Sequence, residues 1–365
     1  NGIGDFYYAP PSGFLALCTA NLPEPTIGPN SLTQADDHFN TVLYTGTGSS
    51  NAITGVGFQT DWLWIKRRNG ATSHRVFDST RANGLFLSTD TANQEDDGSS
   101  LFTSFDSDGF TVQGTSNSTN GSSQTYVAWN WKANGGTTSS NTDGSITSTV
   151  QANTTAGFSI VTYTGTGASA TVGHGLGVAP TMIIFKNRSN TNNWTVYNKD
   201  NGNTNAVFLN LTNANSTGIT FINSTTPSST IFNLLNVTNS NGGNNSIIAY
   251  CFYDVEGYSK FGSYTGNGNA DGTFVYTGFR PAFIITKTSS HASSWSIVDT
   301  TRDPFNIVNQ YLLAESNGAE GDFDSFDILS NGFKARTTNA ERNGDGRTVI
   351  YMAFAEAPFK YANAR

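Results

Sequence analysis

Short apolar segments alternate with polar turns along the whole chain. No segment keeps a helical period over the roughly 11–18 residues that such a prediction needs. Clusters of Gly, Asn, Asp and Ser separate the apolar segments, a pattern typical of short β-strands joined by tight turns. The sequence therefore predicts an all-β protein with little or no helix.

One pattern of landmarks occurs three times. Each copy begins with Tyr-Thr-Gly-x-Gly, continues to an apolar run closed by a lysine, and later reaches an aromatic strand. The lysine follows the tyrosine by 22, 23 and 23 residues, and the last aromatic residue follows the lysine by 65, 66 and 67 residues. The landmarks are Tyr44, Tyr163 and Tyr264, then Lys66, Lys186 and Lys287, then Trp131, Phe252 and Phe354. Spacing this regular indicates internal repetition, and we expect the three lysine-terminated runs to be equivalent central strands.

Each copy has the length and strand pattern of a β-sandwich of jelly-roll or immunoglobulin-like size. The predicted organisation is three tandem β-sandwich modules at 40–134, 157–261 and 262–365, with a flexible Gly/Ser/Thr/Asn linker at 135–156. The second and third copies meet without a polar linker, which predicts one rigid unit. Residues 1–39 are predicted to be the end of a preceding domain plus a proline-rich connector. Because the chain starts at Asn1 rather than Met, we expect it to be a piece of something longer.

Composition narrows the classes of protein. Hydrophobic residues make up 36% and charged residues 13% of the chain, which is too apolar for a disordered protein. The net charge is −8 and no basic stripe occurs, which argues against nucleic-acid binding. No apolar run is long enough to insert in a membrane. Cys18 and Cys251 are predicted to be buried free thiols, and Trp129, Trp131, Phe252 and Phe354 are predicted to be core residues.

A single basic cluster stands out. It consists of Lys66, Arg67, Arg68, His74 and Arg75, around a turn at Asn69-Gly70. Its positive strand ends can contact an acidic glycan or the carboxylates of a neighbouring subunit. The alternative is a solvated hairpin tip that discourages edge pairing. Lys66, Arg67, Arg68 and Arg75 are the candidate glycan or subunit contacts.

Other candidate chemistry is weak. The four histidines lack zinc-ligand spacing and are expected in turns or at the surface. Acidic loops at 95–97 and 320–324 have no predictable catalytic partners, so the sequence predicts a protein that is not an enzyme. Loops 106–109 and 343–346 carry oxygen ligands that suit Ca²⁺, but none fits the twelve-residue calcium loop. No cofactor is therefore predicted, with Ca²⁺ left open.

Several segments resemble a known family. Residues 173–180, 274–283, 329–334 and 351–365 resemble the C-terminal region of tail-fibre-like structural proteins in marine bacteriophages. Residues 4–23 resemble the exit from a lectin-like sandwich domain in the same proteins. The resemblance implies a virion structural protein in a tail fibre, spike or surface appendage, which presents loops to a host-surface glycan or protein. It also implies contacts with other virion proteins, and we expect a homotrimer. The alternatives are a purely structural or decorating virion protein, or an extracellular carbohydrate-active protein.

Overall fold

The structure is a computed structural model that describes residues 25–28, 31–218 and 221–357. Within these residues the regular structure is nearly all β, with two short α-helices, α1 (Thr238–Asn241) and α2 (Ala340–Asn343). Two short 3-10 helices, η2 (Ala35–Asp37) and η3 (Lys199–Asn201), complete the helical content described. Among these residues, no helix is both long and apolar enough to cross a membrane. The prediction of an all-β protein is confirmed.

The same run of four neighbouring antiparallel strands occurs in three sheets. In the first copy it is β1 (Phe39–Thr45), β9 (Thr125–Trp131), β3 (Trp62–Arg67) and β4 (Arg75–Asp78). In the second copy it is β12 (Phe158–Thr164), β19 (Ser246–Phe252), β14 (Met182–Asn187) and β15 (Thr195–Asn198). In the third copy it is β20 (Ser259–Thr265), β27 (Thr348–Ala355), β22 (Pro281–Thr288) and β23 (Trp295–Asp299). The lysine-terminated runs are therefore equivalent central strands, β3, β14 and β22, as predicted.

The remaining strands surround these runs. The first copy adds a sheet of β2 (Asn51–Ile53), β8 (Gly109–Val112) and β7 (Phe102–Asp106), and a pair of β5 (Leu85–Phe86) and β6 (Asp96–Asp97). The second adds the pair β13 (Ala170–Gly173) and β18 (Ile231–Leu234), and extends its main sheet with β16 (Asn205–Phe208) and β17 (Ser216–Thr217). The third continues through β24 (Val308–Leu313), β25 (Gly321–Leu329), β26 (Gly332–Ala335) and β21 (Phe274–Tyr276).

The segment predicted to be a flexible linker differs from the prediction. Residues 135–156 contain β10 (Ser139–Asn141) and β11 (Ser148–Asn153), and β11 pairs with β12. At its start, the buried Asp61 carboxylate accepts hydrogen bonds from the backbone N–H groups of Ala133, Gly135 and Gly136 at 2.7, 2.9 and 2.8 Å. A Gly- and Ser-rich composition indicates flexibility only when nothing binds the backbone, and here a carboxylate and a strand bind it.

Two further predictions concern the bounds of the third copy and the segment before the first copy. The predicted boundary between the second and third copies, at 261/262, falls inside β20, so the third copy begins by Ser259. The predicted preceding domain at 1–39 lies mostly outside the described residues, as does Cys18. Cys251 is buried and free, as predicted for that residue.

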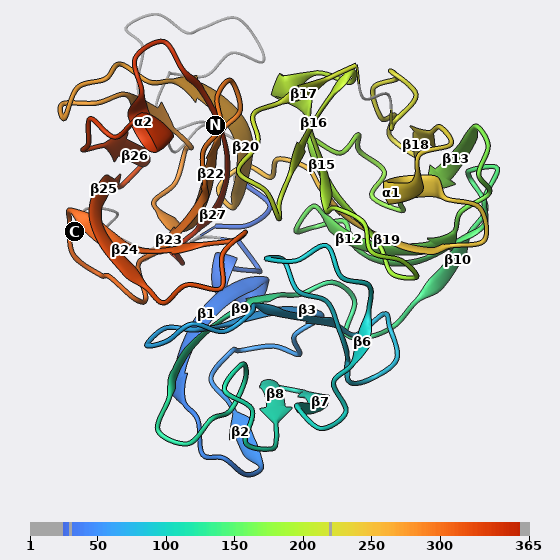
Figure 1. The fold of residues 1–365 in the computed structure, drawn as a ribbon, viewed down its shortest axis with the longest axis horizontal. Coiled ribbons are helices and arrows are strands. Elements are labelled where there is room, and N and C mark those ends of the chain that lie inside the picture. Colours follow the sequence, from blue (N-terminus) through green and yellow to red (C-terminus); the bar gives the residue numbers. More distant parts are fainter. Residues whose placement is uncertain (1–24, 29–30, 219–220, 358–365) are drawn as a thin grey trace, which may run out of the picture.

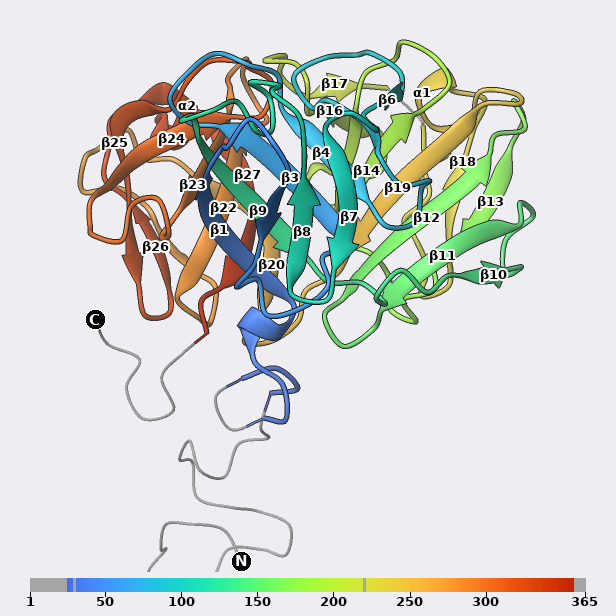
Figure 2. The same ribbon diagram turned by 90° about the horizontal axis from the view of Figure 1, so that it is seen from below.

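The three copies pack around a common centre, as Figures 1 and 2 show, and share one hydrophobic core. Aromatic side chains of all three copies meet there, with ring centroids 4.3 Å apart for Trp62 and Trp131, 4.7 Å for Trp62 and Tyr250, and 5.1 Å for Phe39 and Phe354. The four predicted core residues, Trp129, Trp131, Phe252 and Phe354, are all buried. Smaller clusters lie within the first and second copies.

The Tyr-Thr-Gly-x-Gly motif is a turn anchored by a buried asparagine. The tyrosine hydroxyl donates a hydrogen bond of 2.6 Å to the carbonyl preceding that asparagine in every copy, from Tyr44 to Thr119, Tyr163 to Ser240 and Tyr264 to Arg342. The side-chain oxygen of the asparagine, which is Asn120, Asn241 or Asn343, accepts from the backbone N–H of the residue between the two glycines of the motif. The last glycine of the motif has a positive φ of 71°, 69° or 65°, which favours glycine. The motif is therefore structural.

Replacing Asn241 with Ala is expected to lower the free energy of unfolding by roughly 1–3 kcal/mol, because it removes three hydrogen bonds that the buried Asn241 side chain makes to the backbone. Its side chain accepts from the N–H of Thr166 at 2.9 Å and donates to the carbonyls of Ala168 and Leu235 at 2.6 and 3.2 Å. Urea unfolding measures the loss. The exposed Asn190→Ala is the control, expected to change stability by less than about 0.5 kcal/mol. Equal losses in the two variants would contradict the anchoring role.

Candidate functional site

Lys66, the first member of the predicted basic cluster, is buried at the end of β3. Its ammonium group donates hydrogen bonds to the carbonyls of Arg67 at 2.9 Å and of Asn317, in the third copy, at 3.3 Å. The prediction that Lys66 contacts a glycan or another subunit is therefore wrong, because the side chain is enclosed by its own chain.

The lysines of the other copies make the same kind of contact. Lys186 donates to the carbonyls of Asn192 at 2.6 Å and of Ala92, in the first copy, at 2.8 Å. Lys287 donates to the carbonyls of Ser293 and of Thr212, in the second copy, the latter at 2.9 Å. Burial lowers the pKa of Lys66, Lys186 and Lys287 to about 8, 7 and 8, because a charged group is disfavoured away from water.

These contacts run in one direction around the molecule. The first copy reaches the third, the second reaches the first, and the third reaches the second. Head-to-tail contacts of this kind form a ring when the rotation between neighbours closes. In this chain the ring closes after three copies, so each buried lysine joins two copies.

A second ring of contacts follows eight residues after each lysine. Trp194 donates from Nε1 to the carbonyl of Ser88 at 2.9 Å, and Trp295 donates to that of Phe208 at 2.8 Å. At the corresponding position of the first copy, Nε2 of His74 lies 3.0 Å from the carbonyl of Leu313 in the third copy. Trp64 donates to Nδ1 of His74 at 2.8 Å, which assigns the ring proton to Nε2. The expectation of a turn or surface histidine is wrong for His74, which is buried.

The stability of the protein is expected to fall as the pH drops from about 6.5 towards 3, in part because of His74. Burial, with the nearby Lys66 ammonium, lowers its pKa from 6.5 to about 3. Between these values the unfolded chain binds a proton that the folded chain does not, so protonation favours unfolding. One such site changes the free energy of unfolding by about 1.4 kcal/mol per pH unit. Urea unfolding at pH 6.5, 5.5 and 4.5 should give a shallower slope for His74→Gln than for the wild type. His291→Gln, at an exposed site, is the control; an equal change of slope there would contradict the assignment.

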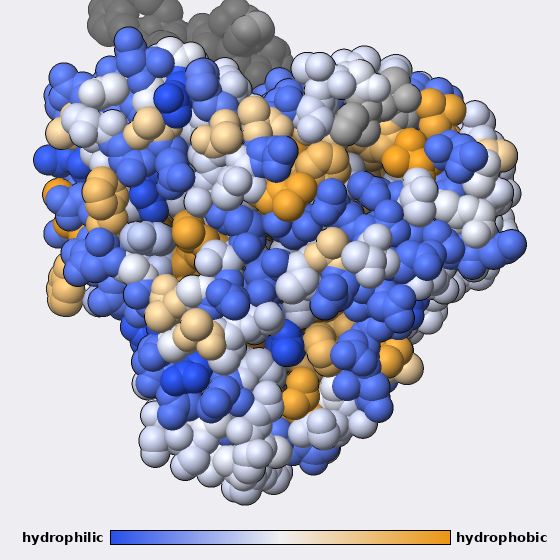
Figure 3. All heavy atoms as spheres, viewed as in Figure 1, coloured by the Kyte–Doolittle hydropathy of each residue, from blue (hydrophilic) through white to orange (hydrophobic). Residues whose placement is uncertain are grey.

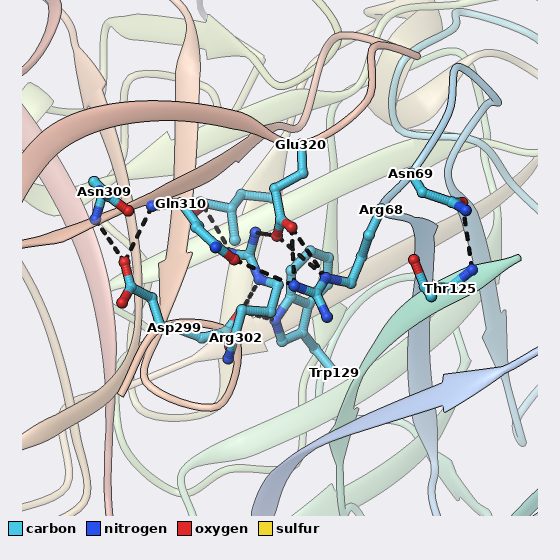
Figure 4. A network of polar contacts seen from close by, with 11 residues as sticks. Arg68, Asn69, Thr125, Trp129, Asp299, Arg302, Asn309, Gln310 and Glu320 are labelled. Carbon is cyan, nitrogen blue, oxygen red and sulfur yellow. Dashed lines mark hydrogen bonds and ion pairs between the residues drawn. The ribbon is translucent and has the colours of Figure 1, made fainter. Parts of the chain in front are cut away.

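Arg68 belongs to an ionic network between the first and third copies, drawn in Figure 4. Its guanidinium lies 2.9 Å from the carboxylate of Glu320, which also binds Arg302 at 2.9 Å. Arg302 in turn binds Asp299 at 2.5 Å, and Trp129 donates to the same Asp299 carboxylate at 3.0 Å. The sequence predicted that this cluster can bind the carboxylate of a neighbouring subunit; for Arg68, the carboxylate belongs to another copy within the same chain.

The interface between the first and second copies repeats this network, whereas the interface between the second and third copies does not. Between the first and second copies, Arg81 binds Asp78 and Glu95, Arg188 binds Glu95, and the Tyr250 hydroxyl donates to Asp78. The corresponding residues between the second and third copies are Asn198, Asn201, Asn215, Ser289 and Met352. Of the network, the bond between backbones is kept there, from the N–H of Asn215 to the carbonyl of Ser289 at 2.7 Å. The network of guanidiniums and carboxylates is therefore present at two interfaces, and neutral residues replace it at the third.

Arg67 and Arg75 complete the cluster. Arg67 donates to Asn69 at 3.0 Å and to Gln124. Arg75 donates to the Ser88 hydroxyl at 2.8 Å, and its guanidinium lies 4.5 Å from the centre of the Phe86 ring. Unlike Lys66 and Arg68, these two arginines contact only their own copy in the bonds described. The four basic residues therefore do not form one ligand-binding surface.

The carboxylates of the loop at 106–109, which suit Ca²⁺ by composition, bind groups of their own chain. Asp106 accepts from the hydroxyls of Ser104 and Thr111 at 2.7 and 2.6 Å. Asp108 accepts from the N–H groups of Gly55 and Gly57 at 3.0 and 2.7 Å. In the described part of the chain, no three His, Cys, Asp or Glu side chains are grouped so that they could hold a metal ion. These contacts are ordinary turn chemistry.

Exposed aromatic residues occur on one edge strand of the third copy. Phe274 and Tyr276 of β21 are 45% and 66% exposed. The equivalent strand pair occurs in each copy. Val275 pairs with Phe333 in the third copy, Ile53 with Phe110 in the first, and Val172 with Phe232 in the second. The counterparts of the two exposed aromatic residues are therefore Ala52 and Thr54 in the first copy, and Thr171 and Gly173 in the second.

The face of the molecule shown in Figure 3 is mostly polar, with apolar residues in scattered patches.

Sequence comparison assigns the chain to a family without assigning an activity. No curated protein matches it. A family model described as "Domain of unknown function (DUF7483)" matches residues 34–358, a range that includes all three copies and every interface between them. The chain belongs to the DUF7483 family.

Proposed function

We propose that the chain is a bacteriophage virion structural protein, part of a tail fibre, spike or surface appendage that attaches to a host-surface glycan or protein. The observation that carries this proposal is the ring of contacts between copies, in which buried lysines and ion pairs join the three repeats. A rigid scaffold is what positions variable surface loops for binding. The resemblance to marine phage proteins supplies the virion location.

Within this proposal, each copy is a β-sandwich module whose repeated four-stranded run packs against outer strands. The outer strands are β2, β7 and β8 in the first copy, β13 and β18 in the second, and β21, β25 and β26 in the third. Clusters of buried side chains such as Ile53, Leu63 and Phe110 support this packing in the first copy. The chemistry described above joins copies rather than forming a reactive centre, which favours a role that is not enzymatic.

Immunogold electron microscopy tests the proposed location. Antibodies raised against the recombinant chain are applied to intact virions of a phage that encodes it. Label on a tail fibre, spike or other appendage is the expected result. Label spread evenly over the capsid supports the alternative, a decorating protein without receptor contact. Virions that contain the chain by mass spectrometry but lack label on any appendage would contradict the proposal.

The homotrimer remains a proposal that rests on the resemblance to fibres. A physical argument also favours oligomers in general, because identical neighbours can cover exposed sheet edges and apolar surfaces. In this structure the shared core joins the three internal repeats of a single chain. Coverage of edges and apolar surfaces therefore does not by itself require other subunits. Light scattering at micromolar concentration decides the question, because a trimer has three times the mass of the single chain.

A further inference from the structure

A cavity of about 290 Å³ lies between the first and third copies. It is lined by Thr41 of β1, Ala282 of β22, Thr300 and Thr301 after β23, and Asp36 of η2. Its volume is close to the lower end of small-molecule sites, which span roughly 300–1,000 Å³. The cavity is therefore of a size for one small ligand or one unit of a larger one.

Polar groups of the chain occupy part of the corresponding place between the first and second copies, beside a cavity of about 300 Å³ lined by Gln59, Ser79 and Gly136. Asp61, five residues before Lys66 as Ala282 is before Lys287, holds three backbone N–H groups there. The Gln151 amide donates to the hydroxyls of Ser79 and Thr80 at 3.0 and 2.8 Å. Ser79 and Thr80 correspond to Thr300 and Thr301 in the third copy. Ala282 supplies no carboxylate, and no glutamine lines this cavity. The polar side chains that bind Ser79, Thr80 and the nearby backbone at one interface therefore have no counterpart in the lining of this cavity.

One polar group in the cavity wall lacks a partner. Thr41 is only 6% exposed, and its hydroxyl makes no hydrogen bond in the described part of the chain. A buried hydroxyl without a partner is unfavourable. A ligand hydroxyl placed in the cavity would satisfy it.

The charges in the wall limit the kind of ligand. The wall contains one guanidinium, that of Arg280, and it lies 2.9 Å from the carboxylate of Glu356. Because this guanidinium already binds a carboxylate, it is not available to pair with an anionic ligand. Phe39 and Pro304 contribute apolar surface, which suits the C–H face of a sugar ring.

We propose that this cavity binds a neutral, polyhydroxylated ligand, namely one hexose unit of a host-surface glycan. The hydroxyls of Thr41, Thr300 and Thr301 would bind the sugar hydroxyls in the place that Asp61 and Gln151 occupy at the neighbouring interface. This assignment rests on the proposed function, since attachment supplies the glycan. It locates the contact at a seam between copies rather than at loop tips.

Saturation-transfer NMR with the full chain tests the assignment. The probes are the methyl glycosides of glucose, galactose and mannose, and methyl glucuronide serves as the anionic probe. At least one neutral glycoside is expected to bind. Ala282→Asp, which places the carboxylate of the neighbouring interface in the cavity, should abolish binding. Thr41→Val, which removes only the hydroxyl, should weaken binding about tenfold, equivalent to about 1.4 kcal/mol.

A second variant controls for the introduced charge. Ala52→Asp introduces the same charge at an exposed site and should bind as the wild type does, and all variants should melt as the wild type does. If no neutral glycoside binds, or if methyl glucuronide binds more tightly, the assignment is overturned. If a glycoside binds equally to Ala282→Asp and Thr41→Val, the glycan site lies elsewhere. Each of these results leaves the labelling test of the virion appendage unaffected, so the two proposals fail separately.

Discussion

Replacing Arg302 with Met is expected to lower the free energy of unfolding by roughly 3–5 kcal/mol, the usual cost of removing one partner of a buried ion pair. The Arg302 side chain has no exposed surface, and it binds Asp299, Glu320 and the Ile297 carbonyl at 2.5, 2.9 and 3.0 Å. Met preserves much of the side-chain volume but leaves two carboxylates without this cation. The loss follows from uncompensated charge rather than from a cavity.

The second copy supplies the matched control. It has Asn198 and Asn201 at the positions of Asp299 and Arg302. The double variant Asp299→Asn with Arg302→Asn removes a charge of each sign, and we expect it to lose less stability than Arg302→Met alone. Equilibrium unfolding in urea measures both variants. A double variant as unstable as the single one would show that packing, rather than charge balance, determines the cost.

Phe252→Ala is expected to cost a similar amount, roughly 3–5 kcal/mol, because truncating a buried aromatic ring removes apolar contacts and leaves a cavity. The ring is 1% exposed, and it contacts Phe158 of its own copy, Trp62 of the first, and Phe354 of the third. Because this core joins all three copies, we expect the variant to unfold in a single transition at a lower denaturant concentration.

Phe274→Ala, the same substitution at an exposed ring, is the control and should change stability by less than about 0.5 kcal/mol. Tryptophan fluorescence and circular dichroism should report coincident transitions for both variants. Two separate transitions in the wild type would show that the copies unfold independently, which contradicts a shared core. Wild-type stability of Phe252→Ala would contradict the burial of the ring.

The sequence predicted the repeated strands because their causes are local. Alternating and continuous apolar runs mark strands, and fixed spacing between Tyr, Lys and aromatic landmarks marks equivalent ones. The linker at 135–156 was mispredicted because its order depends on Asp61, a residue more than seventy positions earlier. Composition describes what a segment prefers alone and carries no information about what binds it.

The candidate site was harder to predict for the same reason. A lysine that closes an apolar run has the pattern of a strand end in solvent, yet the carbonyl that buries Lys66 belongs to Asn317, 251 positions later. One signal was present in the sequence. Asp78 and Arg81 recur as Asp299 and Arg302 with the same spacing, and a repeated acid–base pair three residues apart indicates a repeated ion pair. The asparagines that anchor the turns were missed because Asn is abundant throughout the chain.

The closed ring of copies also determines how the molecule carries load. The chain connects the first copy to the second and the second to the third, but the first and third meet only through non-covalent contacts. Asp36, before the first copy, and Ala357, after the third, line the same cavity, so both ends of the folded body emerge at that seam. Tension applied through the two ends would act on this seam directly, whereas the other two interfaces are bridged by backbone. Under such tension the body would open first at the cavity of this seam, and the Arg68–Glu320 pair, at the other end of the central strands, would resist further opening.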